Sequence, residues 1–170
     1  ANATSGLGID VETVEAGTYQ ILEHSVLPQD AALECTALNV DLIPAHIDLV
    51  AIEIELVDKE NREYMLKQAL ASIKEQYDYI IIDTSAGISE SVFDVVANSD
   101  LNLIVTTPDP ICVRDGRLMS DEFYKRQNKK QRLIINKMNR KIFGEELVSD
   151  LDEIIDTVGV QLIGVIPDDD

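Results

Sequence analysis

Asp83 is the residue whose type and position in this sequence point most directly to chemistry. It ends a run of three isoleucines, Ile80–Ile82, and small residues follow it as far as Gly87. A continuous β-branched apolar run predicts a strand buried on both faces, as in a parallel sheet. Ligands of open α/β sheets bind outside the carboxyl ends of the strands. A carboxylate there can orient a water molecule or Mg²⁺ beside a nucleotide phosphate.

Gly87 adds a second feature to this stretch. Glycine allows a backbone turn that could move with a bound phosphate. The same residues also allow a plainer interpretation, in which Asp83 caps a helix that begins near Ile88. A short motif is only a hypothesis, so both interpretations are open at this point.

Strand-like and helix-like segments alternate along the whole chain. The hydrophobic patterns predict five strands, at 39–43, 79–83, 101–106, 132–136 and 161–166. They predict helices at 18–23, 47–57, 62–76, 88–97, 114–125 and 145–158. Such alternation is typical of βαβ units with right-handed crossovers. We therefore expect an α/β fold, a three-layer parallel sheet with helices on both faces.

The composition limits the classes of function. With 170 residues and 45% hydrophobic content, the chain can form one domain with a real core. The net charge of −18 opposes direct contact with DNA phosphates or anionic lipid. Cys35 and Cys112 fit no metal or redox spacing and read as free thiols of a reducing cytosol. His24 and His46 show no ligand spacing. Because no signal peptide or membrane-spanning run is present, we expect a cytoplasmic protein.

Segments along nearly the whole chain resemble the ParA/MinD family, the deviant Walker A P-loop ATPases. Residues 77–83 resemble the family's Walker B strand. The N-terminal half resembles the partition branch, in residues 2–9, 51–57 and 62–70. The C-terminal half resembles the division-site branch, in residues 84–88, 105–110, 113–117, 133–137 and 164–168. The resemblance implies a P-loop NTPase fold.

The departures from the family pattern are as informative as the matches. The 170 residues contain no Gly-x-x-x-x-Gly-Lys-Ser/Thr phosphate loop. The family's switch I strand and its C-terminal segment are also absent. The resemblance thus predicts an internal fragment, residues 1–170 forming a single partial P-loop ATPase domain that lacks its first strands and is truncated at both ends. Phosphoryl transfer needs a phosphate cradle, so we expect at most half of a nucleotide site and no retained catalytic residue.

The resemblance implies a role for each residue of that half site. Asp83 would act on Mg²⁺ through water, and Gly87 would respond to the γ-phosphate. Asn136 would read adenine with its side-chain amide, and Pro167 and Asp168 would form the turn beside the base. Asn136 could instead simply cap the end of its strand. The cofactors implied for the full-length parent are ATP and Mg²⁺.

The function implied is that of an ATP hydrolase whose ATP-dependent homodimer positions DNA or cell-division machinery with a regulatory partner protein. DNA or membrane contact, including peripheral membrane association, would come only from missing or non-acidic parts of the parent. Arg114 and Asp115 could belong to a partner surface or form a plain surface ion pair. One alternative is a non-catalytic interaction module that keeps the fold without the phosphate loop. Another is a flavodoxin-type domain, although no Ser/Thr/Gly-rich phosphate loop follows a first strand.

Overall fold

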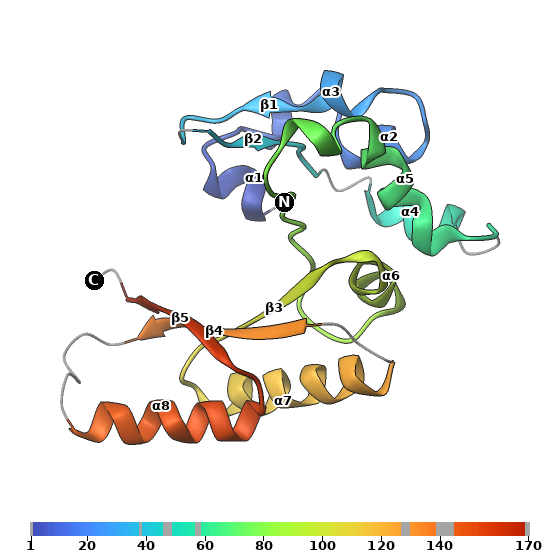
Figure 1. Ribbon diagram of the computed structural model, residues 1–170. Helices are drawn as coiled ribbons and strands as arrows, with labels where there is room; N and C mark the ends of the chain where they lie inside the picture. The colour runs from blue at the N-terminus through green and yellow to red at the C-terminus, as the bar shows by residue number, and fades with distance from the viewer. Residues whose placement is uncertain are drawn as a thin grey trace. The chain divides into compact units, whose positions relative to one another are not determined.

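The structure is a computed structural model (Figure 1) that describes residues 2–37, 39–45, 49–56, 59–126, 130–138 and 145–168. The chain divides into two compact units, Ala1–Ser85 and Ala86–Asp170. Each unit has its own hydrophobic cluster. We describe the two units separately.

The second unit is built on a three-stranded parallel sheet. Its strands are β3 (Leu101–Thr106), β4 (Lys130–Met138) and β5 (Leu162–Pro167), in the order β3–β4–β5. β3 and β4 pair in one unbroken register along the whole of β3. The pairing of β4 with β5 contains two register shifts. The strands predicted at 101–106, 132–136 and 161–166 are therefore confirmed as a parallel sheet.

Three helices pack around this sheet. They are α6 (Glu90–Asn98), α7 (Pro110–Lys125) and α8 (Glu145–Val158). α7 and α8 lie together along one face of the sheet (Figure 1). The core between these elements consists of buried apolar side chains: Val92, Phe93, Val96, Ile104, Val113, Phe123, Leu133, Ile135, Met138, Ile154, Val158 and Val160. This core forms because β3 turns alternate residues toward the helices and leaves the others exposed.

Local sequence signals explain where α7 begins and where α8 ends. Pro110 is the first residue of α7, and the Asp109 carboxylate before it accepts hydrogen bonds from the backbone N–H groups of that first turn. α8 is followed by Gly159 at a φ of 73°, whose N–H donates to the Ile155 carbonyl at 2.8 Å. α8 has the bounds predicted from its periodicity, whereas α7 begins four residues before the predicted Arg114.

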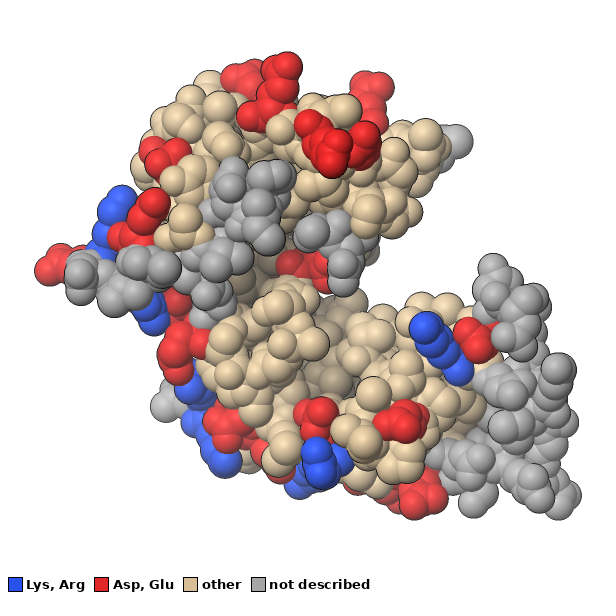
Figure 2. All heavy atoms as spheres, turned by 180° about the vertical axis from the view of Figure 1, so that it is seen from behind, with Lys and Arg blue, Asp and Glu red and all other residues tan. Residues whose placement is uncertain are grey.

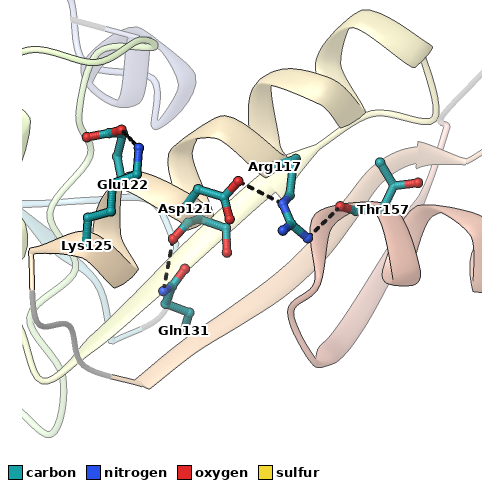
Figure 3. A network of polar contacts seen from close by, with 7 residues as sticks. Arg117, Asp121, Glu122, Lys125, Gln131 and Thr157 are labelled. Carbon is teal, nitrogen blue, oxygen red and sulfur yellow. Dashed lines mark hydrogen bonds and ion pairs between the residues drawn. The ribbon is translucent and has the colours of Figure 1, made fainter.

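Polar side chains form hydrogen bonds between α7 and the neighbouring elements α8 and β4 (Figure 3). The Arg117 guanidinium donates from Nε to Asp121 at 2.9 Å and from a terminal nitrogen to the Thr157 carbonyl at 3.4 Å. Thr157 lies in the last turn of α8, where carbonyl groups lack partners within the helix. Gln131 of β4 donates to the Ser120 carbonyl of α7 at 3.5 Å. The network thus connects α7 to both α8 and the sheet.

The first unit is made of short elements. They are α1 (Asn2–Gly6), η1 (Val11–Thr13), α2 (Thr18–Leu22), α3 (Pro28–Ala31), β1 (Leu33–Glu34), β2 (Asp41–Leu42), α4 (Leu49–Glu55), η2 (Arg62–Tyr64), α5 (Met65–Ala69), η3 (Leu70–Ser72) and η4 (Lys74–Gln76). Among the described residues, its hydrophobic cluster consists of Leu22, Ile52 and Leu56, with Tyr19, Leu49, Met65 and Leu66 packed against it. The predicted helix at 18–23 corresponds to α2. The one predicted at 47–57 corresponds to α4 over 49–55, and residues 47, 48 and 57 lie outside the described residues.

Close packing of Gly17 against Pro44 holds the start of α2. The Thr18 N–H and hydroxyl both donate to the Pro44 carbonyl, at 2.9 and 3.1 Å. A Cβ on Gly17 would lie 2.4 Å from that same carbonyl oxygen, which is closer than van der Waals contact allows. In α2 itself, the Tyr19 hydroxyl donates to Glu23 at 3.1 Å, and this bond is the main reason that the pKa of Tyr19 is raised to about 12.

Two predicted elements of this unit are wrong in form. The strand predicted at 39–43 is only Asp41–Leu42, and it pairs antiparallel with β1 rather than joining a parallel sheet; Leu38 lies outside the described residues. The helix predicted at 62–76 is broken into α5 and three 3-10 turns. Short helices gain their stability mainly from tertiary packing, and here Met65 and Leu66 meet the small cluster rather than a sheet.

The largest correction concerns Ile80–Ile82. We expected an interior strand, but the segment 79–83 has no strand partner among the described residues, and all of its side chains are exposed. Tyr79 and Ile81 are 85% and 84% exposed. A run of isoleucines supplies the apolar surface of a buried strand. A neighbouring backbone must still supply the hydrogen bonds, and a second layer must cover the side chains.

Candidate nucleotide site

The carboxyl ends of β3, β4 and β5 meet at one edge of the sheet, because the three strands run parallel. This edge brings together three of the residues predicted for the site. Asn136 lies near the end of β4, and Pro167 and Asp168 lie at the end of β5. Met138 pairs with Pro167, and the Asp168 N–H donates to the Met138 carbonyl at 2.8 Å. The turn predicted beside the base is therefore held next to the end of β4.

The backbone around Asn136 departs from a regular strand. The pairing with β5 shifts between Ile135 and Met138, and Lys137 has a φ of 56°, in the left-handed region. Bulges and left-handed non-glycine residues are over-represented next to functional sites. The Asn136 side-chain oxygen accepts a hydrogen bond from the Lys137 N–H at 2.9 Å. This bond is a strand-end contact, as the plainer interpretation expects, and it also holds the side-chain amide in one orientation.

The end of β3 contributes a hydrogen-bonded loop to the same edge. Thr106 is 4% exposed, and its hydroxyl donates to the Thr107 carbonyl at 3.1 Å. The loop then reaches Asp109, which caps α7 through Ile111 N–H at 2.9 Å. Sequence reasoning missed this cap because it began the helix at Arg114. The Asp109-Pro110 pair was the available signal, since aspartate favours the capping position and proline the first helical one.

Asp83 and Gly87 lie in the segment that leads into the sheet unit. Asp83 is exposed and belongs to the first unit. It does not cap α6, because the cap residue is Ser89, whose hydroxyl accepts from the Val92 N–H at 3.4 Å. The plainer interpretation of Asp83 is therefore wrong. Gly87 has a φ of 106°, a conformation that glycine adopts far more readily than other residues.

Other candidate residues have ordinary surroundings. Arg114 and Asp115 form an ion pair at 3.3 Å with side chains 70% and 60% exposed, so the pair contributes little to stability. Cys35 and Cys112 are free thiols, as predicted. Within the described ranges no three His, Cys, Asp or Glu side chains cluster as metal ligands. His46, Asp169 and Asp170 lie outside the described residues. No helix in the described part of the chain is long and apolar enough to cross a membrane.

Comparison with known proteins identifies the family. A family model described as an AAA domain matches residues 1–135. The sporulation initiation inhibitor protein Soj of Bacillus subtilis is 43% identical over 99 residues, which are 58% of this chain and 39% of Soj. The septum site-determining protein MinD of B. subtilis is 30% identical over 106 residues, 62% of this chain and 40% of that protein. The chain belongs to the ParA/MinD family of P-loop ATPases.

Solved structures agree with the family in fold. MinD in the MinC:MinD cell division complex of Aquifex aeolicus matches with a TM-score of 0.77 at 22% identity, over 99% of this chain and 64% of that one. McdA of Cyanothece in complex with ATP matches with a TM-score of 0.81 at 18% identity, over 99% of this chain and 68% of that one. The predicted α/β fold of the P-loop NTPase type is therefore confirmed.

The names and titles of the relatives also describe the roles and the ligands of family members in general terms. Relatives similar to this chain include a chromosome partitioning protein and a septum site-determining protein, and the similar MinD of Pyrococcus furiosus is named a cell division ATPase. Solved members contain nucleotide, as in MinD with Mg-ADP from Pyrococcus horikoshii, so ATP and Mg²⁺ are ligands of the family. This chain spans about two fifths of the length of the first curated relatives, 39% of Soj and 40% of MinD.

Proposed function

We propose that this chain is part of a ParA/MinD-type ATPase and supplies the base-binding half of its nucleotide site. The observation that carries the proposal is the edge at which Asn136 lies beside Pro167 and Asp168. A side-chain amide can donate to and accept from the edge of a purine, as it does when proteins read adenine. The orientation of the Asn136 amide, held by the Lys137 N–H, prepares it for that contact.

Asp83 and Gly87 would serve the phosphate side of the same nucleotide. An exposed carboxylate such as Asp83 can orient a Mg²⁺-bound water, and the metal would take its other ligands from water and phosphate oxygens. Gly87, with its left-handed backbone, would let the following segment respond to the γ-phosphate. The phosphate loop itself would come from a part of the protein outside these 170 residues, in keeping with a partial domain.

The whole protein would act as an ATP-dependent homodimer in the cytoplasm that positions DNA or cell-division machinery. A regulatory partner protein fits this proposal, because the similar MinD of A. aeolicus was solved in complex with MinC. Acidic side chains are scattered over the face shown in Figure 2, in keeping with the net charge of −18. DNA or peripheral membrane contact would therefore involve other, less acidic parts of the whole protein.

Binding of a fluorescent ADP analogue to the purified chain tests the base-binding role. We expect Asn136→Leu to weaken binding about 2- to 10-fold, the cost of one hydrogen bond of roughly 0.5–1.5 kcal/mol. Asn98→Ala is the control, since the Asn98 side-chain amide donates to the Asp94 carbonyl of its own helix at 3.1 Å and Asn98 is not among the residues proposed for the site. Equal binding by wild type and Asn136→Leu would remove Asn136 from the site.

Phosphate release by the same chain tests a second expectation of the proposal, and nucleotide binding separates the proposal from its alternative. The chain should release no phosphate from ATP above the buffer level, because its sequence contains no Gly-x-x-x-x-Gly-Lys-Ser/Thr loop whose lysine would cradle the developing charge. Turnover that Asp83→Ala abolishes would contradict this expectation. A chain that binds no nucleotide at all, but still folds, would favour the non-catalytic interaction module.

A further inference from the structure

Two buried polar atoms on neighbouring strands lack hydrogen-bond partners. They are the donor Nδ2 of Asn102 in β3 and the acceptor Oε1 of Gln131 in β4, and they are the two buried side-chain atoms of this kind within the described residues. We propose that Asn102 and Gln131 together bind one ordered water molecule, which accepts from Asn102 and donates to Gln131. The site lies at the amino-terminal end of the sheet and does not depend on the proposed function.

The pairing of the strands places the two side chains next to each other. Asn102 and Gln131 are direct partners in the register of β3 with β4. Side chains two residues further along the two strands lie on the same face of the sheet, and these are Ile104 and Leu133. Ile104 is 5% exposed and Leu133 is 0% exposed, and both belong to the core. The polar pair therefore continues the buried row of the core toward the start of the strands.

Helix α7 covers the polar pair. Gln131 donates from Nε2 to the Ser120 carbonyl of α7 at 3.5 Å (Figure 3). Asn102 is 6% exposed and Ser120 is 8% exposed. The bond to Ser120 uses the nitrogen of the Gln131 amide, so the oxygen of the same amide needs a partner elsewhere. The two unpaired atoms thus lie under α7, out of contact with bulk water.

A water molecule supplies what both atoms need. Burying an amide atom without a hydrogen bond is costly, and most buried side-chain polar atoms in proteins have a partner. The Asn102 nitrogen and the Gln131 oxygen do not bond to each other. A buried water typically binds two to four polar groups that are otherwise unsatisfied. Because one of these atoms is a donor and the other an acceptor, a single water molecule can satisfy both.

The bridge also favours the observed register of β3 and β4. A shift of the pairing by two residues would keep the same side chains on the inner face. It would place Asn102 beside Leu133, or Gln131 beside Ile104, according to its direction. Either shift separates the polar pair and leaves its buried atoms without the shared water. The bridge therefore adds a penalty against slippage to the apolar pattern that already specifies the register.

Water–protein NMR on the ¹⁵N-labelled chain is the experiment. A water molecule held inside a protein gives nuclear Overhauser cross peaks whose sign differs from that of rapidly exchanging surface water. We expect such a cross peak between water and the side-chain amide protons of Asn102. Ser120→Ala is the first control, because the exchangeable hydroxyl proton of Ser120 could mimic a water signal. The cross peak should persist in this variant.

Removing the acceptor tests the assignment to Gln131. Gln131→Met keeps a similar length without Oε1, so it should abolish the cross peak. It should also lower the folding equilibrium constant roughly 5- to 150-fold, because buried polar atoms lose their partners. Gln68→Met is the matched control, since it makes the same change at an exposed position of α5. It should leave both the cross peak and the folding equilibrium constant as in wild type.

The double variant Asn102→Leu/Gln131→Met completes the test. It leaves neither amide of the pair, so it should be more stable than Gln131→Met alone. A wild type without the cross peak would overturn the proposal and would mean that the two side chains bond directly in solution. Loss of the cross peak in Ser120→Ala, or its survival in Gln131→Met, would also overturn it. So would a double variant less stable than Gln131→Met.

Discussion

The two units of this chain differ in how much each can bury. The unit Ala86–Asp170 places a parallel sheet against helices of 9 to 16 residues around a large apolar core. Among the described residues of the unit Ala1–Ser85, helices have at most 7 residues and the hydrophobic cluster has three buried side chains. Both contain segments that read as strands from sequence. Only the unit with neighbouring strands and a covering layer turns such segments into a parallel sheet, whereas the first unit forms one antiparallel pair of two-residue strands among its described residues. A local apolar pattern therefore needs a neighbouring strand before it becomes part of a larger sheet.

Truncating one core residue in each unit tests this contrast most strongly. Leu133 is 0% exposed at the centre of the larger core, so Leu133→Ala should lower the free energy of unfolding by about 4 kcal/mol. Ile52 is 7% exposed in the small cluster. Its site can relax more easily, so Ile52→Ala should cost about 2 kcal/mol, the low end of such substitutions. Urea unfolding of both variants measures the two values, and an equal or larger cost at Ile52 would refute the contrast.

Packing in the first unit can be probed at Gly17. The Cβ of Gly17→Ala would lie 2.4 Å from the Pro44 carbonyl oxygen, so the backbone must shift, and we expect a loss of about 1–3 kcal/mol. Gly6→Ala is the control, since a Cβ on Gly6 would meet no atom within 4 Å. Thermal unfolding of both variants is the measurement. If Gly17→Ala melts like Gly6→Ala, the first unit does not hold this contact.

Substitutions at Ser89 and Asp83 should have smaller effects on the free energy of unfolding. They distinguish a residue that caps a helix from one that has a chemical role. Ser89 caps α6, so Ser89→Ala should destabilise the chain by about 1 kcal/mol. Asp83→Ala should leave the unfolding free energy unchanged, because Asp83 is exposed and does not cap α6. Circular dichroism during urea unfolding distinguishes the two. A loss in Asp83→Ala as large as that in Ser89→Ala would restore a structural role for Asp83.

The same contrast explains what could be predicted from sequence. The three parallel strands and the bounds of α8 follow from long periodic segments, whose pattern leaves little choice. The meeting of Asn136 with Pro167 and Asp168 followed as well, because parallel strands end at one edge. The exposure of Ile80–Ile82 could not be predicted, since burial of these side chains depends on a neighbouring strand rather than on the residues themselves. The left-handed Lys137 had no sequence signal, whereas the Asp109 cap did.

The central claim is that the carboxyl edge of β3, β4 and β5 binds the base of an adenine nucleotide. Titrating the ¹⁵N-labelled chain with Mg-ADP and with adenosine, and following the backbone amide resonances, tests it most directly. We predict that both ligands shift the amides of Asn136, Lys137 and Asp168, and that adenosine alone suffices because the contact is with the base. Shifts at the opposite end of the sheet, around Lys130 and Gln131, or no shifts with either ligand, would contradict the account.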